Sequence, residues 1–399
     1  MDKRFGVAKT GKFSVVDAGA PSKSKSKSKK SAEPIKLEVP FFDPNNVRKS
    51  ELSVEERFDL CRSVAEECTK DEELLKLLSF KDHPVVYDGF EPSGRMHIAQ
   101  GVLRAINVNK LTRSGCIFKF WVADWFAQLN NKMGGDLHKI QVVGQYMIEI
   151  WKAVGMDMQN VQFLWASEEI NNSPNEYWSR VMEIARLNSI SRIQRCCTIM
   201  GRTESDDMKA SQIFYPVMQC SDIFFLKADI CQLGVDQRKV NMLAREYCDD
   251  TKPKIKHKPV ILGHHMLMGL KEGQEKMSKS DPDSAIFMED SEVDVNRKVK
   301  KGYCPPRVVE GNPILDYANY IVLGYFGEME VSLKQSGEVV YTNYQTLEQD
   351  FVSGKLHPSD LKPAVSKAIN KILQPVRDHF KRGEPAKLLA LVKKYKVTK

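Results

Sequence analysis

Residues 85–101 read VVYDGFEPSGRMHIAQG and pass from a short apolar run, through a turn, into an amphipathic segment. The run at 85–90 is typical of a strand, and residues 98–111 have the apolar periodicity of a helix. Gly94 in the connection permits the backbone to approach a ligand closely. A strand that leads through a short loop into a helix begins a β–α–β unit, which predicts a parallel sheet covered by helices.

The same alternation of strand and helix continues downstream. Further strands are expected at 117–123, 161–166, 229–233 and 260–262, and further helices at 140–154, 173–185, 212–225 and 237–247. Ser173-Pro174-Asn175-Glu176 predicts a capping box at the start of one helix. We therefore predict an α/β fold with a Rossmann-like parallel sheet, in which ligands bind beyond the carboxyl ends of the strands.

The regions on either side of the sheet differ in composition. Residues 1–33 contain the run PSKSKSKSKK and too few large apolar side chains to offset the entropy of folding, so a disordered Lys/Ser-rich tail is expected. A helical segment is expected at 34–80, with its periodic stretch at 53–78, before the α/β domain at 81–302. Residues 303–399 favour a mainly helical domain after the candidate linker Pro305-Pro306; its helices are expected at 314–323, 347–351, 361–380 and 386–395.

Positive charge is concentrated at the two ends of the chain. The net charge of +8 divides into +6 for residues 1–33, +9 for residues 362–399 and −7 for the remainder. Basic ends on an acidic body favour a polyanionic partner that is held at those ends. For the N-terminal run, weak attraction of a nucleic acid and simple solubility both stay open.

Composition and the lack of targeting signals narrow the class of protein. With 42% hydrophobic and 28% charged residues, the chain is ordinary for a soluble protein, and no apolar run approaches the roughly 20 residues of a membrane helix. The N-terminus has no apolar signal core, and Arg4 is the only arginine before residue 34. The nine cysteines lack metal-site spacings, so we expect reduced thiols, no metal site and a cytosolic location.

Two segments have the composition of phosphate-binding loops. In the first, Pro92 to Gln100, Gly94 precedes His97, which is expected at a helix entrance where backbone N–H groups favour a phosphate. The second, Lys276 to Ser280, reads KMSKS, and its two lysines and two hydroxyls suit a polyphosphate clamp. Taken singly, a histidine after a strand is more often structural, and such a pentapeptide is more often a solvated loop.

Taken together, the two segments resemble the HIGH-like and KMSKS signatures of class I aminoacyl-tRNA synthetases. The segments 87–94 (YDGFEPSG), 215–222 (YPVMQCSD), 234–239 (GVDQRK) and 312–314 (NPI) are similar to those of archaeal and eukaryotic tyrosyl-tRNA synthetases. The resemblance implies activation of L-tyrosine by ATP to tyrosyl-adenylate with release of pyrophosphate. Transfer of tyrosine to the 3′ end of its tRNA, in cytosolic protein synthesis, is the implied second step.

The resemblance also implies which residues handle ATP. His97, Lys276 and Lys279 are expected to be catalytic, and ATP is expected to contact Gly94, His97, Gln100, Lys276, Ser278 and Lys279. These groups would position the reactants and stabilise charge on the phosphate oxygens. Mg2+ is expected to accompany ATP as part of the substrate, without a dedicated protein site, and no tightly bound cofactor is expected.

A tyrosine pocket is implied at five residues, which are Tyr87, Tyr215, Gln219, Asp222 and Gln237. Tyr87 and Asp222 are expected to bond the phenol, because a site built for a hydroxyl rejects phenylalanine by about 10⁴–10⁵; this enzyme class is itself the standard example. Tyr215, Gln219 and Asp222 have the spacing of one helix face, which core packing seldom fills with Gln and Asp. Tyr215, Gln219 and Gln237 would hold the amino and carboxyl ends of tyrosine.

The C-terminal helical domain is implied to bind the anticodon. His357-Pro358-Ser359-Asp360 is similar to the anticodon turn of the family, where His357 could stack on a base and Asp360 could accept from its edge. An ordinary proline-initiated helix is the alternative for these residues. The implied partners are tRNA(Tyr), L-tyrosine, ATP and a second copy of the chain in a homodimer, whose interface would use the helix at 140–154.

Two other functions share much of this pattern. A tryptophanyl-tRNA synthetase has the same fold and signatures, although the pair Tyr87 and Asp222 favours a phenol. A catalytically inactive tRNA-binding relative would have no physical reason to keep both phosphate-binding segments. The first signature departs from many class I enzymes, with Ala99 and Gln100 in place of Gly and His, and Gln100 cannot become cationic.

Overall fold

The structure is a computed structural model, and it describes residues 38–200, 209–277, 281, 283–334 and 337–395. The described residues, from Glu38 onward, belong to one compact unit. The tail predicted at 1–33 lies outside the described residues. None of the helices in the described part combines the length and apolarity that crossing a bilayer requires.

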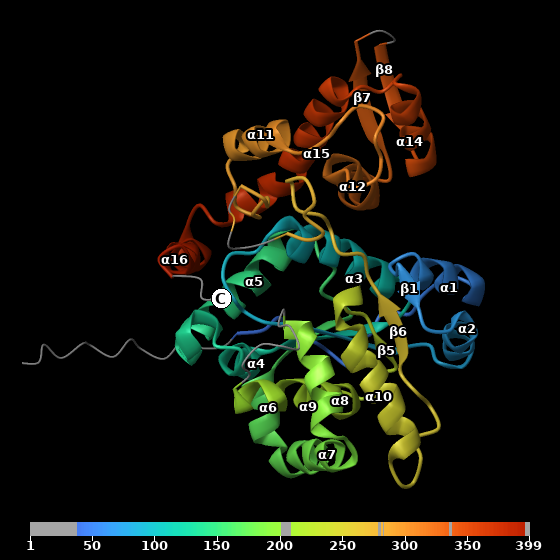
Figure 1. Ribbon diagram of the computed structural model, residues 1–399, viewed down its shortest axis with the longest axis vertical. Helices are drawn as coiled ribbons and strands as arrows, with labels where there is room; N and C mark the ends of the chain where they lie inside the picture. Colours follow the sequence, from blue (N-terminus) through green and yellow to red (C-terminus); the bar gives the residue numbers. More distant parts are fainter. Residues whose placement is uncertain (1–37, 201–208, 278–280, 282, 335–336, 396–399) are drawn as a thin grey trace, which may run out of the picture. The chain divides into compact units, whose positions relative to one another are not determined.

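A six-stranded sheet forms the centre of the α/β part (Figure 1). Its strands are β1 (Glu67–Cys68), β2 (Val85–Phe90), β3 (Ile117–Val122), β4 (Val161–Trp165), β5 (Ile230–Cys231) and β6 (Val260–Gly263), in the order β1-β6-β5-β2-β3-β4. All neighbouring strands are parallel except β1, which pairs antiparallel with β6 at one edge. The predicted Rossmann-like α/β class is confirmed, with one antiparallel edge strand added.

The strand order reverses beside β2. The chain runs outward from β2 through β3 and β4, then returns to β5 on the opposite side of β2. The loops that follow β2 and β5 therefore diverge, which opens a crevice at the carboxyl edge of the sheet. In doubly wound sheets this is the place where ligands bind.

The helices of the α/β part follow the predicted alternation. They are α1 (Val54–Arg62), α2 (Asp71–Phe80), α3 (Arg104–Arg113), α4 (Asp124–Leu129), α5 (Leu137–Ala153), α6 (Ala166–Asn172), α7 (Pro174–Leu187), α8 (Ile190–Cys196), α9 (Ala210–Phe225) and α10 (Arg238–Asp250). Shorter helical turns are η1 (Ala99–Leu103), η2 (Lys132–Gly135), η3 (Cys197–Met200) and η4 (Val235–Gln237). Because η1 is a π-helical turn, the helix predicted at 98–111 begins with a wide turn directly after His97.

The two faces of the sheet belong to separate apolar cores. Val86 and Phe120 point to the face covered by α3 and α5, whereas their neighbours Tyr87 and Trp121 point to the face covered by α7, α9 and α10. Successive residues of a strand face opposite sides, so one strand contributes to both cores. This alternation places Tyr87 on the same side as α9.

Two local predictions near the helix ends were wrong. The periodic stretch at 53–78 is two helices, because Glu67 and Cys68 pair with β6, a strand far along the chain. The capping box at Ser173 is absent, although α7 does begin at Pro174. Ser173 also ends α6, and its ψ of 54° is not the extended conformation that a capping side chain requires.

The C-terminal part is mainly helical, as predicted. It contains α11 (Glu292–Lys301), α12 (Pro313–Tyr317), η5 (Ala318–Leu323), α13 (Gly324–Phe326), β7 (Met329–Leu333), β8 (Gly337–Tyr341), α14 (Tyr344–Ser353), α15 (Pro358–His379) and α16 (Gly383–Val392). The β7–β8 hairpin was not predicted, although Met329, Val331 and Leu333 alternate with exposed residues as a half-buried strand does.

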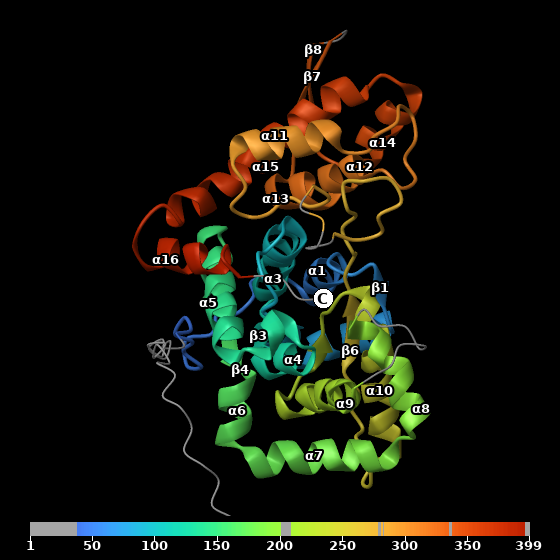
Figure 2. The same ribbon diagram turned by 60° about the vertical axis from the view of Figure 1, so that its left-hand side comes forward.

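Two contacts of this part bear on the predicted domain organisation. Helix α11 packs along α15, so residues before the predicted boundary at 303 lie with the helices after it (Figure 1). The division into domains stays a prediction. Helix α16 packs against α5, which is the helix at 140–154 that was expected to meet a second subunit, and that interface stays a prediction (Figure 2).

Candidate active site

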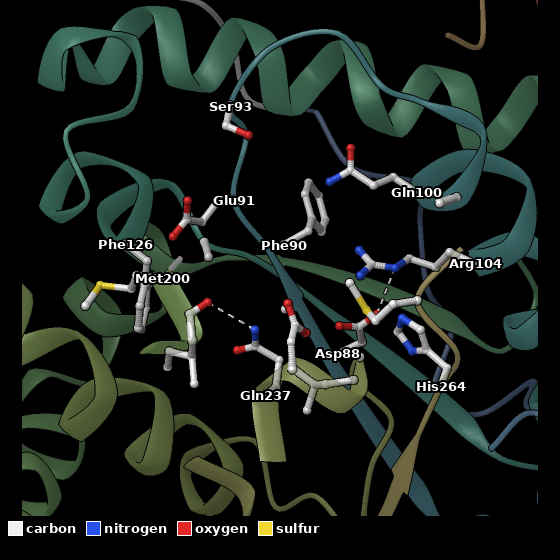
Figure 3. Close-up of a pocket in the computed structure, with 18 of the residues that line it drawn as sticks. Asp88, Phe90, Glu91, Ser93, Gln100, Arg104, Phe126, Met200, Gln237 and His264 are labelled. Carbon is white, nitrogen blue, oxygen red and sulfur yellow. Dashed lines mark hydrogen bonds and ion pairs between the residues drawn. The ribbon is translucent and has the colours of Figure 1, made fainter. Parts of the chain in front are cut away.

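A cavity of about 340 Å³ lies at the crevice beyond the carboxyl ends of β2 and β5 (Figure 3). All five residues of the predicted tyrosine pocket line it, namely Tyr87, Tyr215, Gln219, Asp222 and Gln237. From the predicted ATP site, His97, Gln100 and Lys276 line the same cavity. Residues from four segments that are distant in sequence are thereby brought together.

Tyr87 and Asp222 form the buried end of the cavity. The Oδ1 of Asp222 accepts a hydrogen bond from the Tyr177 hydroxyl at 2.8 Å, whereas Oδ2 has no hydrogen-bond partner among the described residues. Burial raises the pKa of Asp222 well above its usual range, and the hydroxyls of Tyr177 and Tyr87 oppose that shift. Burial and the Asp222 charge raise the pKa of Tyr87, so its phenol stays protonated. This end of the cavity suits a ligand hydroxyl.

A row of polar side chains follows helix α9, as the spacing of Tyr215, Gln219 and Asp222 predicted. The Gln219 Nε2 donates to the Gln237 Oε1 at 3.1 Å. The Gln237 Nε2 donates in turn to the Ile199 carbonyl at 3.3 Å, which is the dashed line at Gln237 in Figure 3. Each amide is therefore oriented by a neighbour. The result is a fixed polar wall between the buried carboxylate and the mouth of the cavity.

Glu91, directly after β2, lines the cavity and was not singled out from the sequence (Figure 3). The Asn130 Nδ2 lies 3.1 and 3.2 Å from its two carboxylate oxygens, and the Lys132 Nζ lies 3.9 Å from Oε2. Burial and this carboxylate raise the pKa of Tyr215 well above its usual range. A partly buried carboxylate here suits the ammonium group of an amino acid.

The segment Pro92 to Gln100 crosses the carboxyl edge of the sheet between β2 and η1. Gly94 has φ of +129°, which residues with a side chain rarely adopt, but it does not line the cavity. The backbone of His97 bridges to Phe287, and its carbonyl accepts the N–H of Gln100 at 3.0 Å. The Gln100 Oε1 is buried without a hydrogen-bond partner in the described part of the chain.

A buried ion pair in the cavity wall was also missed by sequence reasoning. The Arg104 Nε lies 2.9 Å from the Asp88 Oδ2, and His264 lies beside the pair (Figure 3). Burial raises the pKa of Asp88 to about 7, although Arg104 opposes the shift. Burial and the Arg104 charge lower the pKa of His264 to about 3, so its imidazole is neutral. No local pattern connects these three positions.

Part of the KMSKS segment is described. Lys276 is exposed at the cavity, and its Nζ lies 3.5 Å from the Asp236 Oδ2. Ser278, Lys279 and Ser280 lie outside the described residues, so their predicted contacts with ATP stay predictions.

The predicted anticodon residues lie away from this cavity, at the start of α15. The His357 Nδ1 accepts the N–H of Ser359 at 3.1 Å and so caps the helix. In the neutral imidazole this leaves the proton on Nε2. Asp360 is largely buried in the first turn. These contacts account for a helix start, and the anticodon role stays a prediction.

The fold and the cavity agree with a comparison against protein families. A family model described as tRNA synthetases class I (W and Y) matches residues 79–374, so the chain belongs to this family. Within it, the tyrosine--tRNA ligase 1, cytoplasmic, of Arabidopsis thaliana is 62% identical over 349 residues, which are 87% of this chain and 90% of that protein. The predicted membership of the tyrosyl-tRNA synthetases is confirmed.

Solved structures separate the tyrosyl from the tryptophanyl alternative. The tyrosyl-tRNA synthetase of Leishmania major in complex with tyrosinol aligns with a TM-score of 0.82 and 54% identity over 86% of this chain, which spans 61% of that chain. The Pyrococcus horikoshii tyrosyl-tRNA synthetase complexed with L-tyrosine aligns with a TM-score of 0.78 and 34% identity. The alignment covers 85% of this chain and 100% of that chain. A tryptophanyl-tRNA synthetase from Aeropyrum pernix has 17% identity, 81% and 84% coverage and a TM-score of 0.61, which shows the fold alone.

Proposed function

We propose that this chain is a tyrosine–tRNA ligase. It activates L-tyrosine with ATP to tyrosyl-adenylate, releases pyrophosphate, and transfers tyrosine to the 3′ end of tRNA(Tyr). The observation that supports this proposal most directly is the buried Asp222 carboxylate, which lines the cavity together with Tyr87. The Oδ2 of Asp222 has no hydrogen-bond partner among the described residues. A buried acceptor costs free energy until a ligand donates to it, which a phenol does and a phenylalanine ring does not.

The activation step forms a bond from a tyrosine carboxylate oxygen to the α-phosphorus of ATP and breaks the bond to the pyrophosphate oxygen. We assign His97, Lys276 and Lys279 to the stabilisation of negative charge on the phosphate oxygens. Gly94, Gln100 and Ser278 are assigned to ATP binding. ATP use follows from the family, and we propose that Mg2+ enters with ATP, held largely by phosphate and water oxygens.

The polar end of tyrosine is assigned to the row along α9 and to Glu91. Tyr215, Gln219 and Gln237 provide hydroxyl and amide groups, and the Glu91 carboxylate offers a charge for the ammonium group. With Asp222 at the other end, the amino acid is held at both its polar ends. Its carboxylate is then directed toward the part of the cavity that His97 and Lys276 share.

Transfer requires the tRNA to be held by the same chain. We assign His357 and Asp360 to the anticodon, with His357 stacking on a base through its exposed ring and Asp360 accepting from a base edge. The strongly basic residues 362–399 would supply phosphate contacts, which dominate the affinity of such complexes. A salt-sensitive tRNA affinity is therefore part of the proposal.

We further propose that the enzyme works in the cytosol, since the name of the Arabidopsis thaliana relative includes the word cytoplasmic.

We also propose that the enzyme is a homodimer. Met182, Ile190 and Phe214 are exposed apolar side chains on α7, α8 and α9, and these helices pack together. A second copy would cover them. Light scattering should give a dimer for the unaltered protein and a smaller species for Ile190→Asp; equal masses would contradict this interface.

The proposed reaction is tested by ATP–pyrophosphate exchange with each of the standard amino acids in turn, followed by charging of total tRNA. Tyrosine alone should support exchange, and only tRNA(Tyr) should be charged. Exchange with tryptophan instead would make the enzyme a tryptophanyl-tRNA synthetase. No exchange with any amino acid would make it an inactive relative.

A further inference from the structure

Asp222 is held by a residue that lies behind the cavity wall. Tyr177 of α7 is fully buried and does not line the cavity, yet its hydroxyl donates to the Asp222 Oδ1 at 2.8 Å. The same hydroxyl lies 3.3 Å from the Met218 carbonyl, one turn earlier on α9. Tyr177 therefore contacts both the carboxylate and the helix that carries it.

Neighbouring aromatic rings hold the Tyr177 ring in place. Phe225 and Trp178 lie edge-on to it, with ring centroids 5.2 and 5.6 Å away. Helix α7 packs against α9 (Figure 2). Tyr177 is fully buried in the core that the two helices share, and Trp178 and Phe225 are partly buried against that core. Burial and the Asp222 charge raise the pKa of Tyr177 well above its usual range, so the hydroxyl stays a donor.

The two oxygens of Asp222 have different surroundings. Oδ1 is occupied by Tyr177, and Oδ2 is buried without a hydrogen-bond partner in the part of the chain that the structure describes. A carboxylate that lost its bond at Oδ1 could turn about its Cβ–Cγ bond, or it could take up a proton, because burial favours the neutral form. Either change would leave the cavity without a fixed, charged acceptor.

We propose that Tyr177 is a positioning residue for the choice of amino acid: it fixes Asp222 so that Oδ2 accepts the hydroxyl of tyrosine. This inference rests on the proposed function and adds a specificity-determining residue that touches no substrate. The competing explanation is that Tyr177 is an ordinary core tyrosine, for which Asp222 is merely a convenient acceptor. In that case its hydroxyl would stabilise the fold without affecting selection.

The test is Tyr177→Phe, which removes one oxygen atom and keeps the ring. A hydrogen bond to a charged group contributes about 1.5–3 kcal/mol, which corresponds to about a ten- to hundredfold change. In pyrophosphate exchange, kcat/KM for tyrosine should fall by that factor, mainly through KM, while the low value for phenylalanine stays constant. The ratio of kcat/KM for tyrosine to kcat/KM for phenylalanine should therefore fall by the same factor.

Tyr247→Phe is the matched control. The Tyr247 hydroxyl donates to the Glu183 Oε2 at 2.5 Å, and Tyr247 belongs to the same apolar core without lining the cavity. Both variants lose a hydroxyl–carboxylate bond, so both should melt at a lower temperature. Only Tyr177→Phe should change the amino-acid ratio.

A second pair of variants covers the case in which Tyr177→Phe does not fold. Tyr177→Gln and Tyr177→Met have side chains of similar length, but only Gln keeps a donor, so the Gln variant should be the more selective of the two. Equal ratios in Tyr177→Phe and the unaltered protein, or equal ratios in the Gln and Met variants, would overturn the inference. If the unaltered protein did not activate tyrosine at all, the proposed function itself would fail.

Discussion

At the scale of single residues, Asp222 is the group to which our proposal assigns discrimination against phenylalanine most directly. Asp222→Asn keeps the shape of the side chain but removes its charge, so the phenol loses a charged acceptor. We expect kcat/KM for tyrosine to fall about 10- to 100-fold, with selectivity over phenylalanine reduced accordingly. Pyrophosphate exchange with both amino acids measures this, and unchanged selectivity would show that the phenol binds elsewhere.

His97 also lines the cavity, and its replacement should have a different kinetic signature. His97→Ala removes a group proposed to act on the phosphates as their charge changes, so kcat for exchange should fall by about 10²–10³. The KM for tyrosine should change little, since no part of tyrosine is assigned to His97. A large rise in that KM with constant kcat would place His97 in amino-acid binding.

The sequence pattern that predicted the residues lining the pocket does not predict the residues that contact them. Tyr215, Gln219 and Asp222 share one helix face, which is a local pattern and can be read directly. Tyr177 and Glu91 depend on where α7 and the turn after β2 pack, and no short-range spacing records that packing. Such partners are determined by tertiary structure and were therefore missed.

At the scale of elements, the loop that carries His97 is joined to the segment just before α11. The N–H of Ile98 donates to the Ile286 carbonyl, and the N–H of Met288 donates to the Met96 carbonyl, both at 2.9 Å. Arg95 joins the same two segments, because its Nε lies 2.5 Å from the buried Glu289 carboxylate.

Glu289→Gln should loosen this joint. The neutral amide of the Gln variant would no longer balance the charge of Arg95. It would also alter the hydrogen bond that the Glu289 Oε2 accepts from the Tyr146 hydroxyl at 2.9 Å. We expect a loss of about 1–3 kcal/mol in the free energy of unfolding and a lower kcat for activation. Urea unfolding and exchange kinetics measure the two effects.

Glu384→Gln serves as the control for that experiment. Its ion pair with Lys387 is largely exposed, and exposed pairs contribute little. Neither its stability nor its kcat should change measurably. If Glu289→Gln behaved in the same way, the Arg95–Glu289 contact would have no part in holding the His97 loop.

Elements were predictable where local pattern and tertiary structure agree. Strand β2 was predicted with its observed bounds at 85–90, because its apolar run is bounded by turns. The prediction of helix through 53–78 was wrong at β1, because pairing of β1 with β6 outweighs the local helix preference there. The β7–β8 hairpin was missed although its alternation of buried and exposed residues was visible in the pattern.

At the scale of the whole molecule, His265 joins three parts of the chain. Its Nδ1 lies 2.9 Å from the Glu66 carboxylate just before β1, and its Nε2 lies 2.8 Å from the Asp316 carboxylate in α12. The ring stacks on Tyr320, with centroids 4.1 Å apart. The residue itself lines the cavity, in the segment that follows β6. One imidazole thus connects the segment after the N-terminal helix α1, the end of the sheet and the C-terminal helices.

This joint should make stability depend on pH in a defined direction. Burial by itself would lower the pKa of His265, but the bonds to Asp316 and Glu66 outweigh it and raise the pKa above its ordinary value of 6.5. A raised folded-state pKa means that the stabilisation is complete below 6.5 and is lost as pH rises through the folded value. Between those two values the native protein holds a proton that the unfolded chain has released.

The contribution of His265 is isolated by comparison with His265→Gln, which keeps a polar side chain but cannot titrate. The free energy of unfolding of each protein is measured in urea across pH 5.5 to 9, and the difference between the two curves removes the titration of all other groups that behave alike. That difference should be largest at the acidic end and should shrink as pH rises above 6.5. A difference that stays flat, or that grows with pH, would mean that His265 is neutral in the native protein and does not bind Glu66 and Asp316 as a cation.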